Sequence, residues 1–199
     1  MNNLAKPLQS LRELTAGLRA DLEKQVRRVS MRHGGLLILA DVSASMAERV
    51  GADATSLNGA CSKHELLKEV LANVLRPGDG LIAFAGKPLR LATAADLPAP
   101  LGGTALELAL SEAVVSQPSV TLVISDGQPR HAEAALTEAG KLKGIVNVVY
   151  CGPDDDAEAL AFMHRLAAQG GGRCWVYDLR REAARAQLEA GIRGALGKG

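Results

Sequence analysis

The feature of this chain that most restricts its fold is a regular alternation of short apolar runs with helix-length segments. GLLILAD at 35–41 is a continuous apolar run that ends in Asp41, as expected of a strand buried on both faces of a sheet. Further strands are predicted at 80–86, 88–93, 119–125, 144–150 and 172–178, and helices at 62–76, 104–115, 131–142, 157–168 and 181–196. This order predicts an α/β fold with a mostly parallel sheet covered by helices on both faces.

A basic amphipathic helix is predicted ahead of this body, so the chain divides into an N-terminal segment, 1–33, and a domain, 34–199. Apolar residues recur at helical spacing between Pro7 and Val29. Residues 1–33 hold seven Lys and Arg against three Asp and Glu. The helix either packs on its own domain or docks on a partner, and its charge either faces solvent or contacts an acidic partner.

Composition excludes several classes of protein. The 199 residues carry a net charge of +1, with 47% hydrophobic and 23% charged residues, which is typical of a globular protein. No apolar run approaches the roughly 18 residues that span a bilayer, and the N-terminus lacks an apolar signal core. With one Trp, two Tyr and two Phe, a base-stacking nucleic-acid surface is not expected.

The cysteines indicate a reducing compartment. There are three of them, and none forms a C-x-x-C pair, which argues against a disulfide framework or a zinc site. We expect Cys151 and Cys174 to be core residues and Cys61, in a polar loop, to be exposed. A cytoplasmic location follows as an expectation.

Oxygen-bearing side chains follow the predicted strands in a pattern that indicates a metal site. Asp41, Ser43 and Ser45 come after the first strand, Thr104 opens a helix after Gly102-Gly103, and Asp126 follows the strand ending at Ser125. The carboxyl ends of parallel strands are where such sheets bind ligands. Carboxylates and hydroxyls are hard donors of the kind that Mg²⁺ accepts.

Two simpler interpretations of these residues remain open. Thr104 and Glu107 have the spacing of a helix capping box. Asp41 and Asp126 have the chemistry of ordinary turn residues at strand ends.

The D-x-S-x-S, T and D-G motifs together resemble the von Willebrand factor type A (VWA) domain family and its metal-ion-dependent adhesion site. The resemblance covers about residues 35–197. It implies a Rossmann-like three-layer sandwich with one antiparallel edge strand, which the second strand of the 80–93 hairpin would supply. It also implies that Ser43, Ser45 and Thr104 approach the ion through hydroxyls, and Asp41 and Asp126 directly or through water.

The function we expect is binding without catalysis. A divalent ion, Mg²⁺ or else Mn²⁺ or Ca²⁺, would capture an acidic side chain of a partner protein. Several bacterial relatives of the fold serve ATPase or chelatase complexes, so the partner could belong to such an assembly. Segment 47–61 is expected to lie over or beside the ion, or else to be a surface insertion. The alternative function is a Mg²⁺-dependent phosphoryl or ester hydrolase, although Ser43 stands where a haloacid-dehalogenase-like phosphatase needs a second Asp.

Overall fold

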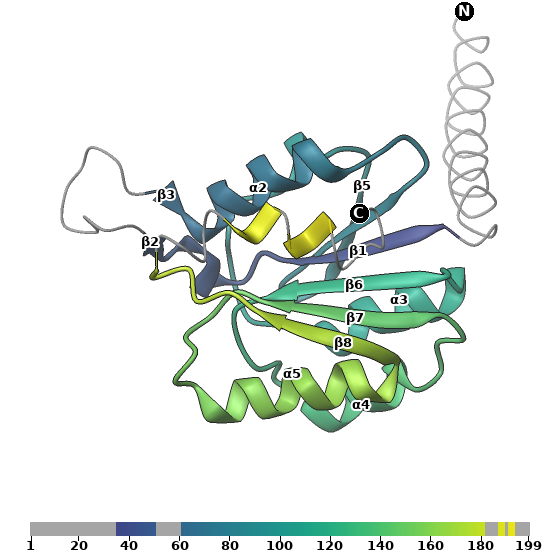
Figure 1. Ribbon diagram of the computed structural model, residues 1–199. Helices are drawn as coiled ribbons and strands as arrows, with labels where there is room; N and C mark the ends of the chain where they lie inside the picture. The colour runs from purple at the N-terminus through teal and green to yellow at the C-terminus, as the bar shows by residue number, and fades with distance from the viewer. Residues whose placement is uncertain (1–34, 51–60, 182–186, 190, 194–199) are drawn as a thin grey trace, which may run out of the picture.

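A central sheet of six strands organises the molecule (Figure 1). The computed structural model describes residues 35–50, 61–181, 187–189 and 191–193. The strands of this sheet are, in chain order, β1 (Leu36–Asp41), β4 (Gly80–Phe84), β5 (Pro88–Leu91), β6 (Val120–Ser125), β7 (Ile145–Tyr150) and β8 (Gly171–Val176). They lie in the order β5-β4-β1-β6-β7-β8, and all neighbours pair in parallel except β4 and β5. The predicted hairpin and antiparallel edge strand are confirmed.

β1 lies in the middle of the sheet and is buried on both faces, as its apolar run predicts. Leu37 and Leu39 pack into one hydrophobic cluster, and Ile38 and Ala40 pack into the other. Successive side chains of a strand point to opposite faces, so a run without polar residues is required here. Asp41, at the end of this run, is buried as completely as the apolar residues before it.

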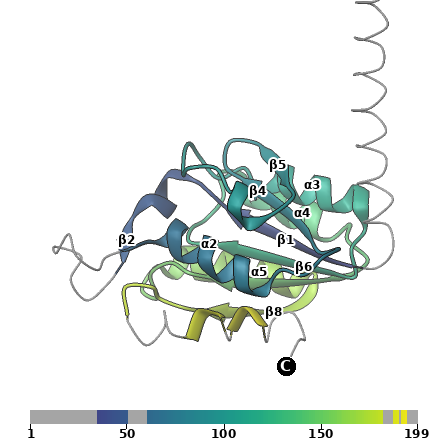
Figure 2. The same cartoon turned by 90° about the horizontal axis from the view of Figure 1, so that it is seen from above.

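Helices cover both faces of the sheet and complete the three layers (Figures 1 and 2). α3 (Leu106–Ser116), α4 (Ala132–Ala139) and α5 (Ala157–Gln169) cover the face that holds Leu37 and Leu39. α2 (Lys63–Val74) covers the other face. Beside α2 lie helical residues 187–189 and 191–193, where Asn73 donates to Glu189 at 3.3 Å. The fold is therefore the Rossmann-like α/β sandwich.

The predicted helix boundaries differ in their accuracy. α2 begins after Ser62, whose hydroxyl accepts the amide of Glu65 while the Glu65 carboxylate accepts the amide of Ser62, so the S-x-x-E spacing forms a capping box. α3 begins two residues later than predicted. Its N-cap is Ala105, without a side-chain cap, rather than Thr104.

A two-stranded ladder interrupts the segment that we expect to shape the metal site. β2 (Arg49–Val50) pairs antiparallel with β3 (Cys61–Ser62), after a short 3₁₀ helix at Ala44–Ala47. The sequence pattern predicts a loop over 47–61, so this ladder is a difference from the prediction. Cys61 is half-buried on β3 rather than exposed, because it packs against the hydrophobic cluster on the α2 face of the sheet. Cys151 is buried, as predicted, and Cys174 is half-buried on β8.

Some predictions fall outside the described residues. These are the basic helix of 1–33, most of segment 47–61 and much of the helix predicted at 181–196. Within the described part of the chain, no helix is both long and apolar enough to cross a membrane.

Candidate metal centre

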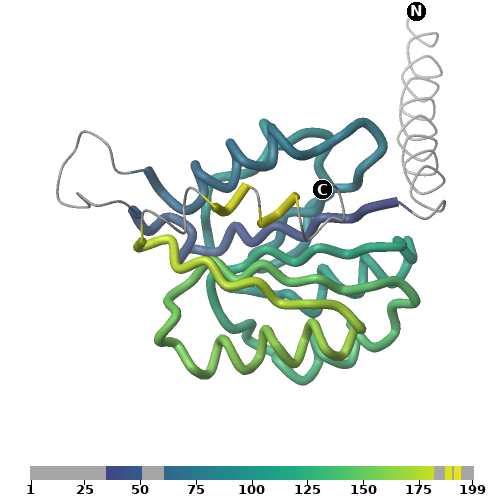
Figure 3. Tube along the Cα trace, in the orientation of Figure 1, coloured from purple at the N-terminus to yellow at the C-terminus, as the bar shows by residue number. Residues whose placement is uncertain are grey.

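Four of the five predicted ligands are linked at the carboxyl ends of β1 and β6. These two strands are neighbours in the sheet, so the loops that follow them start side by side. In Figure 3 the chain leaving these strands and β8 gathers at one edge of the sheet. The parallel pairing therefore brings together residues that are 81 positions apart in the chain, such as Ser45 and Asp126.

The loop after β1 curls around the carboxylate of Asp41. The backbone amide of Ser43 donates to Asp41 Oδ1 at 2.7 Å, which turns the chain back toward the strand end. The hydroxyls of Ser43 and Ser45 lie 3.1 Å apart and are hydrogen-bonded to each other. Alternate residues of the D-x-S-x-S motif therefore face a common centre.

Asp126 closes this cluster from the β6 side. The Ser45 hydroxyl donates to Asp126 Oδ1 at 2.7 Å. Asp126 is only 5% exposed and Asp41 is fully buried. Two buried carboxylates, the buried Ser43 and the exposed Ser45 thus lie together at the sheet edge.

Thr104 is held beside this cluster by its backbone. Leu101 donates to the carbonyl of Val42 at 2.9 Å, and Ala44 donates to the carbonyl of Gly102 at 3.1 Å. On the other side, the amide of Arg130 donates to the carbonyl of Thr104 at 3.2 Å. The loop of Thr104 is thus tied to the loops after both β1 and β6, although among the described residues no hydrogen bond joins the Thr104 hydroxyl to the other four.

The interpretation of Thr104 as part of a capping box is wrong. Because the helix begins at Leu106, Thr104 lies outside the N-cap position. Within the described chain, the buried Oε2 of Glu107 has no hydrogen-bond partner, so Glu107 completes no box. The Thr104 hydroxyl is left available for another role.

Asp41 is electrostatically unsatisfied. Burial raises the pKa of Asp41 to about 6, although the bonds from Ser125 and Ser43 lower it, and the nearby charge of Asp126 raises it further. The Ser125 hydroxyl donates to Asp41 Oδ2 at 2.6 Å. No Lys or Arg among the described residues pairs with Asp41, so its negative charge is balanced only by dipoles.

Lys63 is a charged neighbour that the sequence analysis missed. Its ammonium donates to Asp126 Oδ2 at 2.9 Å and also to Glu48, and its side chain is 3% exposed. Burial alone would lower the pKa of Lys63, but the bond to Glu48 and the charge of Asp126 outweigh it, and the pKa lies above its usual value. The signal in the sequence was weak: a lysine directly after the helix N-cap usually points to solvent.

The donor set suits a hard divalent cation. Asp41 and Asp126 are buried acceptors, the hydroxyls of Ser43 and Ser45 are hydrogen-bonded to each other, and the Ser45 hydroxyl also bonds to Asp126. Magnesium takes oxygen ligands of this kind and commonly keeps several waters. Within the described ranges no cluster of three or more His, Cys, Asp or Glu is placed to hold a metal, so a site here depends on the hydroxyls.

A cavity of about 240 Å³ opens next to Thr104. Arg130, His131 and Glu107 also line it. Arg130 is exposed, and its guanidinium lies close to Gly103, where an added Cβ would be 3.3 Å from the Arg130 side chain. The cavity shares Thr104 with the candidate centre and carries the cationic side chain of Arg130, while the other four predicted ligands do not line it.

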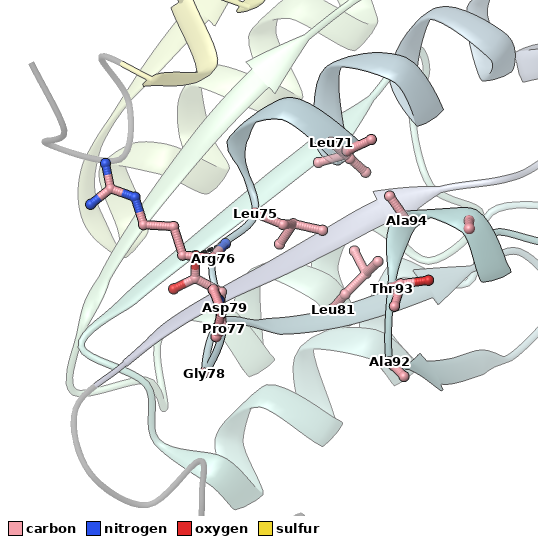
Figure 4. A pocket seen from close by; sticks show the side chains of 12 residues that line it. Leu71, Leu75, Arg76, Pro77, Gly78, Asp79, Leu81, Ala92, Thr93 and Ala94 are labelled. Carbon is pink, nitrogen blue, oxygen red and sulfur yellow. Dashed lines mark hydrogen bonds between the residues drawn. The ribbon is translucent and has the colours of Figure 1, made fainter.

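A larger cavity of about 390 Å³ lies at the opposite edge of the sheet (Figure 4). It is lined by Leu71 and Leu75 of α2, by Arg76 and Asp79 before β4, and by Ala92–Ala95 after β5. These loops lie at the amino end of β4, away from the predicted ligands. None of the five predicted ligands lines this cavity.

A third buried carboxylate, Asp178, follows β8. Asp178 accepts hydrogen bonds from the backbone and the guanidinium of Arg180, with the shortest at 2.7 Å. These bonds hold the pKa of Asp178 at about 2, well below its usual value, although partial burial opposes them. Arg180 also contacts the exposed Asp155 at 2.8 Å.

Comparison with known proteins adds little to this geometry. No protein-family model matches the chain, and no curated protein matches it. A solved structure described as an uncharacterized membrane spanning protein from Vibrio fischeri is similar at 18% identity. The match covers 80% of this chain and 98% of that one, with a TM-score of 0.32.

Proposed function

We propose that this chain is a VWA-type binding module with a metal-ion-dependent adhesion site. Asp41, Ser43, Ser45, Thr104 and Asp126 would hold a divalent ion, Mg²⁺ or else Mn²⁺ or Ca²⁺. When bound, the ion would supply a coordination position for a carboxylate of a partner protein. The module itself would bind without catalysing a reaction.

The observation that carries this proposal is the convergence of Asp41 and Asp126 with the two serine hydroxyls. A buried carboxylate such as Asp41 normally has a cationic partner. Among the described residues its hydrogen bonds come from neutral groups, including the Ser43 amide at 2.7 Å and the Ser125 hydroxyl at 2.6 Å. Such a group costs stability in the free protein, and a bound cation would compensate it.

The recess beside Thr104 is one approach for an acidic ligand. It carries the exposed Arg130 and His131, together with Glu107, whose Oε2 is buried. A carboxylate that enters there approaches a positive side chain as well as the centre. A protein partner in a larger cytoplasmic assembly, such as an ATPase complex, would present such a group on its surface.

Metal binding is the first test. Mg²⁺ titrated into the wild-type protein in metal-free buffer should raise the melting temperature and give a saturable heat by calorimetry. Asp41→Ala should abolish both signals. Ser116→Ala is the matched control, because that buried hydroxyl bonds only to carbonyls of its own helix.

Partner binding is the second test. Immobilised wild-type protein should retain proteins from an extract of the source cells in Mg²⁺ and release them in EDTA. Once purified, a retained protein should bind wild type at least tenfold more tightly than it binds Asp41→Ala, and its affinity should fall in EDTA. Equal affinity in all these conditions would refute the proposal.

A further inference from the structure

Lys63 places a fixed positive charge inside the candidate centre. It is the first residue of α2, and the capping box of Ser62 and Glu65 sets the direction of the helix start. Its backbone amide donates to the carbonyl of Glu48 at 3.0 Å, which ties the same residue to the loop after β1. The ammonium is therefore held near Asp126 from two sides.

Both oxygens of Asp126 are already in use. Oδ1 accepts the Ser45 hydroxyl at 2.7 Å, and Oδ2 accepts the Lys63 ammonium at 2.9 Å. A ligand carboxylate of a divalent ion would have to give up or share the contact with Lys63. Glu48 offers the ammonium a second acceptor, so Lys63 can leave Asp126 without losing all its partners.

The buried charges also bear on the ligand that the centre prefers. Asp41 and Asp126 together balance one divalent cation, and Lys63 then adds one positive charge in excess. Glu48 offsets this only weakly, because its side chain is 56% exposed and water screens its charge. One further anion, such as a partner carboxylate, would restore neutrality in the buried part of the centre.

We propose that Lys63 competes with the divalent ion for Asp126, so that the centre binds the ion weakly alone and firmly only together with an anionic ligand. This inference rests on the proposed function, because it assigns a regulator to the same site. Lys63 is a positioning and tuning residue here, not a ligand. By linkage, a carboxylate that strengthens ion binding must itself bind more strongly when the ion is present.

The experiment compares Mg²⁺ affinity in four proteins: wild type, Lys63→Met, Lys63→Arg and Lys68→Met. Lys63→Met removes the charge and keeps most of the volume. It should lower the dissociation constant for Mg²⁺ on the order of tenfold, because the ion is no longer repelled by a positive charge a few ångströms away. Lys63→Arg should stay near wild type. Lys68→Met, which removes a charge from a half-buried position of the same helix, should change affinity less than twofold.

A second arm tests the coupling with acetate as the carboxylate probe. Replacing chloride with acetate at constant ionic strength and constant free Mg²⁺ should tighten Mg²⁺ binding in wild type. The effect should be several-fold smaller in Lys63→Met. An equal acetate effect in the two proteins would refute the coupling.

The outcomes separate this inference from the proposed function. If neither wild type nor Lys63→Met binds Mg²⁺, Mn²⁺ or Ca²⁺, the metal centre itself is refuted. If wild type binds Mg²⁺ and Lys63→Met binds it equally or more weakly, only the role of Lys63 is refuted. If Lys63→Met does not fold, the side-chain ¹⁵N resonance of Lys63 in wild type decides: it should shift on saturation with Mg²⁺, and an unchanged resonance would overturn the inference.

Discussion

Asp41 and Asp178 lie at the same edge of the sheet and are both buried, yet their charges are balanced in opposite ways. Asp178 is bound by the guanidinium of Arg180, and its pKa falls to about 2. Asp41 is bonded only to neutral groups of Ser43 and Ser125 within the described part of the chain, and burial raises its pKa to about 6. Asp178 is thus neutralised by a cation of its own chain, whereas Asp41 pairs with no Lys or Arg among the described residues, as its proposed role as a metal ligand requires.

The largest effect is expected where the internal ion pair is broken. Asp178→Ala should lower the free energy of unfolding by about 2 to 3 kcal/mol at pH 7, because several charge-assisted hydrogen bonds are lost. The pKa of Asp178 is lower in the folded state than in the unfolded state, so this contribution is present above about pH 4 and is lost as the pH falls toward 2. Urea unfolding at pH 7 and pH 2.5, with and without Mg²⁺, would measure it.

Asp178→Ala should lose the same amount of unfolding free energy in Mg²⁺ as in EDTA. A Mg²⁺-dependent loss would contradict the assignment of Asp178 to structure alone.

Asp41→Asn should raise the free energy of unfolding in the absence of metal, whereas Asp178→Ala lowers it. The pKa of Asp41 is raised in the folded state, so its ionised form destabilises the protein above the unfolded-state pKa, and the penalty is complete above about pH 6. The neutral amide should therefore stabilise the protein in EDTA at pH 8 by about 1 to 2 kcal/mol. The gain should vanish near pH 4, and Mg²⁺ should no longer stabilise the variant.

Melting curves in EDTA between pH 4 and pH 8 would follow this change. A variant that is less stable than wild type at pH 8 in EDTA would show that the charge of Asp41 is compensated within the protein.

Ser125→Ala should weaken the centre without removing a ligand. The Ser125 hydroxyl holds Asp41 Oδ2 at 2.6 Å, so its loss leaves that carboxylate less well oriented and its pKa higher still. The dissociation constant for Mg²⁺ should rise several-fold, which corresponds to a loss of about 1 kcal/mol of binding free energy. Calorimetry beside Ser116→Ala, which removes the same atom elsewhere, would distinguish an effect on the site from a general one.

The smallest effect is expected at Asp155, which contacts the same arginine as Asp178 but lies in solvent. Its side chain is 75% exposed. Asp155→Ala should change the free energy of unfolding by less than about 0.5 kcal/mol, because water and salt screen exposed pairs. A loss as large as that of Asp178→Ala would mean that Arg180 depends on both carboxylates together.

Structure could be predicted from the sequence where a local pattern is compatible with a single structural element. The unbroken apolar run before Asp41 predicts a central strand, because only such a position buries both faces. The S-x-x-E spacing of Ser62 and Glu65 predicts the start of α2, and that cap forms. The order of elements predicts a mostly parallel sheet, which is confirmed, and its neighbouring strands β1 and β6 bring the loops after Asp41 and Ser125 together.

The surroundings of Lys63, Ser125 and Thr104 could not be predicted, because they are set by residues far away in the sequence. The inward turn of Lys63 follows from the approach of α2 to Asp126, a residue 63 positions away. Ser125 looks like an ordinary strand residue until the parallel register sets it against Asp41. Thr104 matched a capping pattern, but the helix starts later because its loop is held by the backbones of Val42 and Arg130.

The short ladder of β2 and β3 gives the molecule a natural point of variation. Val50 pairs with Cys61, so the chain between them leaves and rejoins the body at adjacent positions. The entropic cost of closing such a connection rises only slowly with its length. A connection of another length or sequence can therefore join Val50 to Cys61 while β2, β3 and the loop that carries Ser43 and Ser45 keep their places.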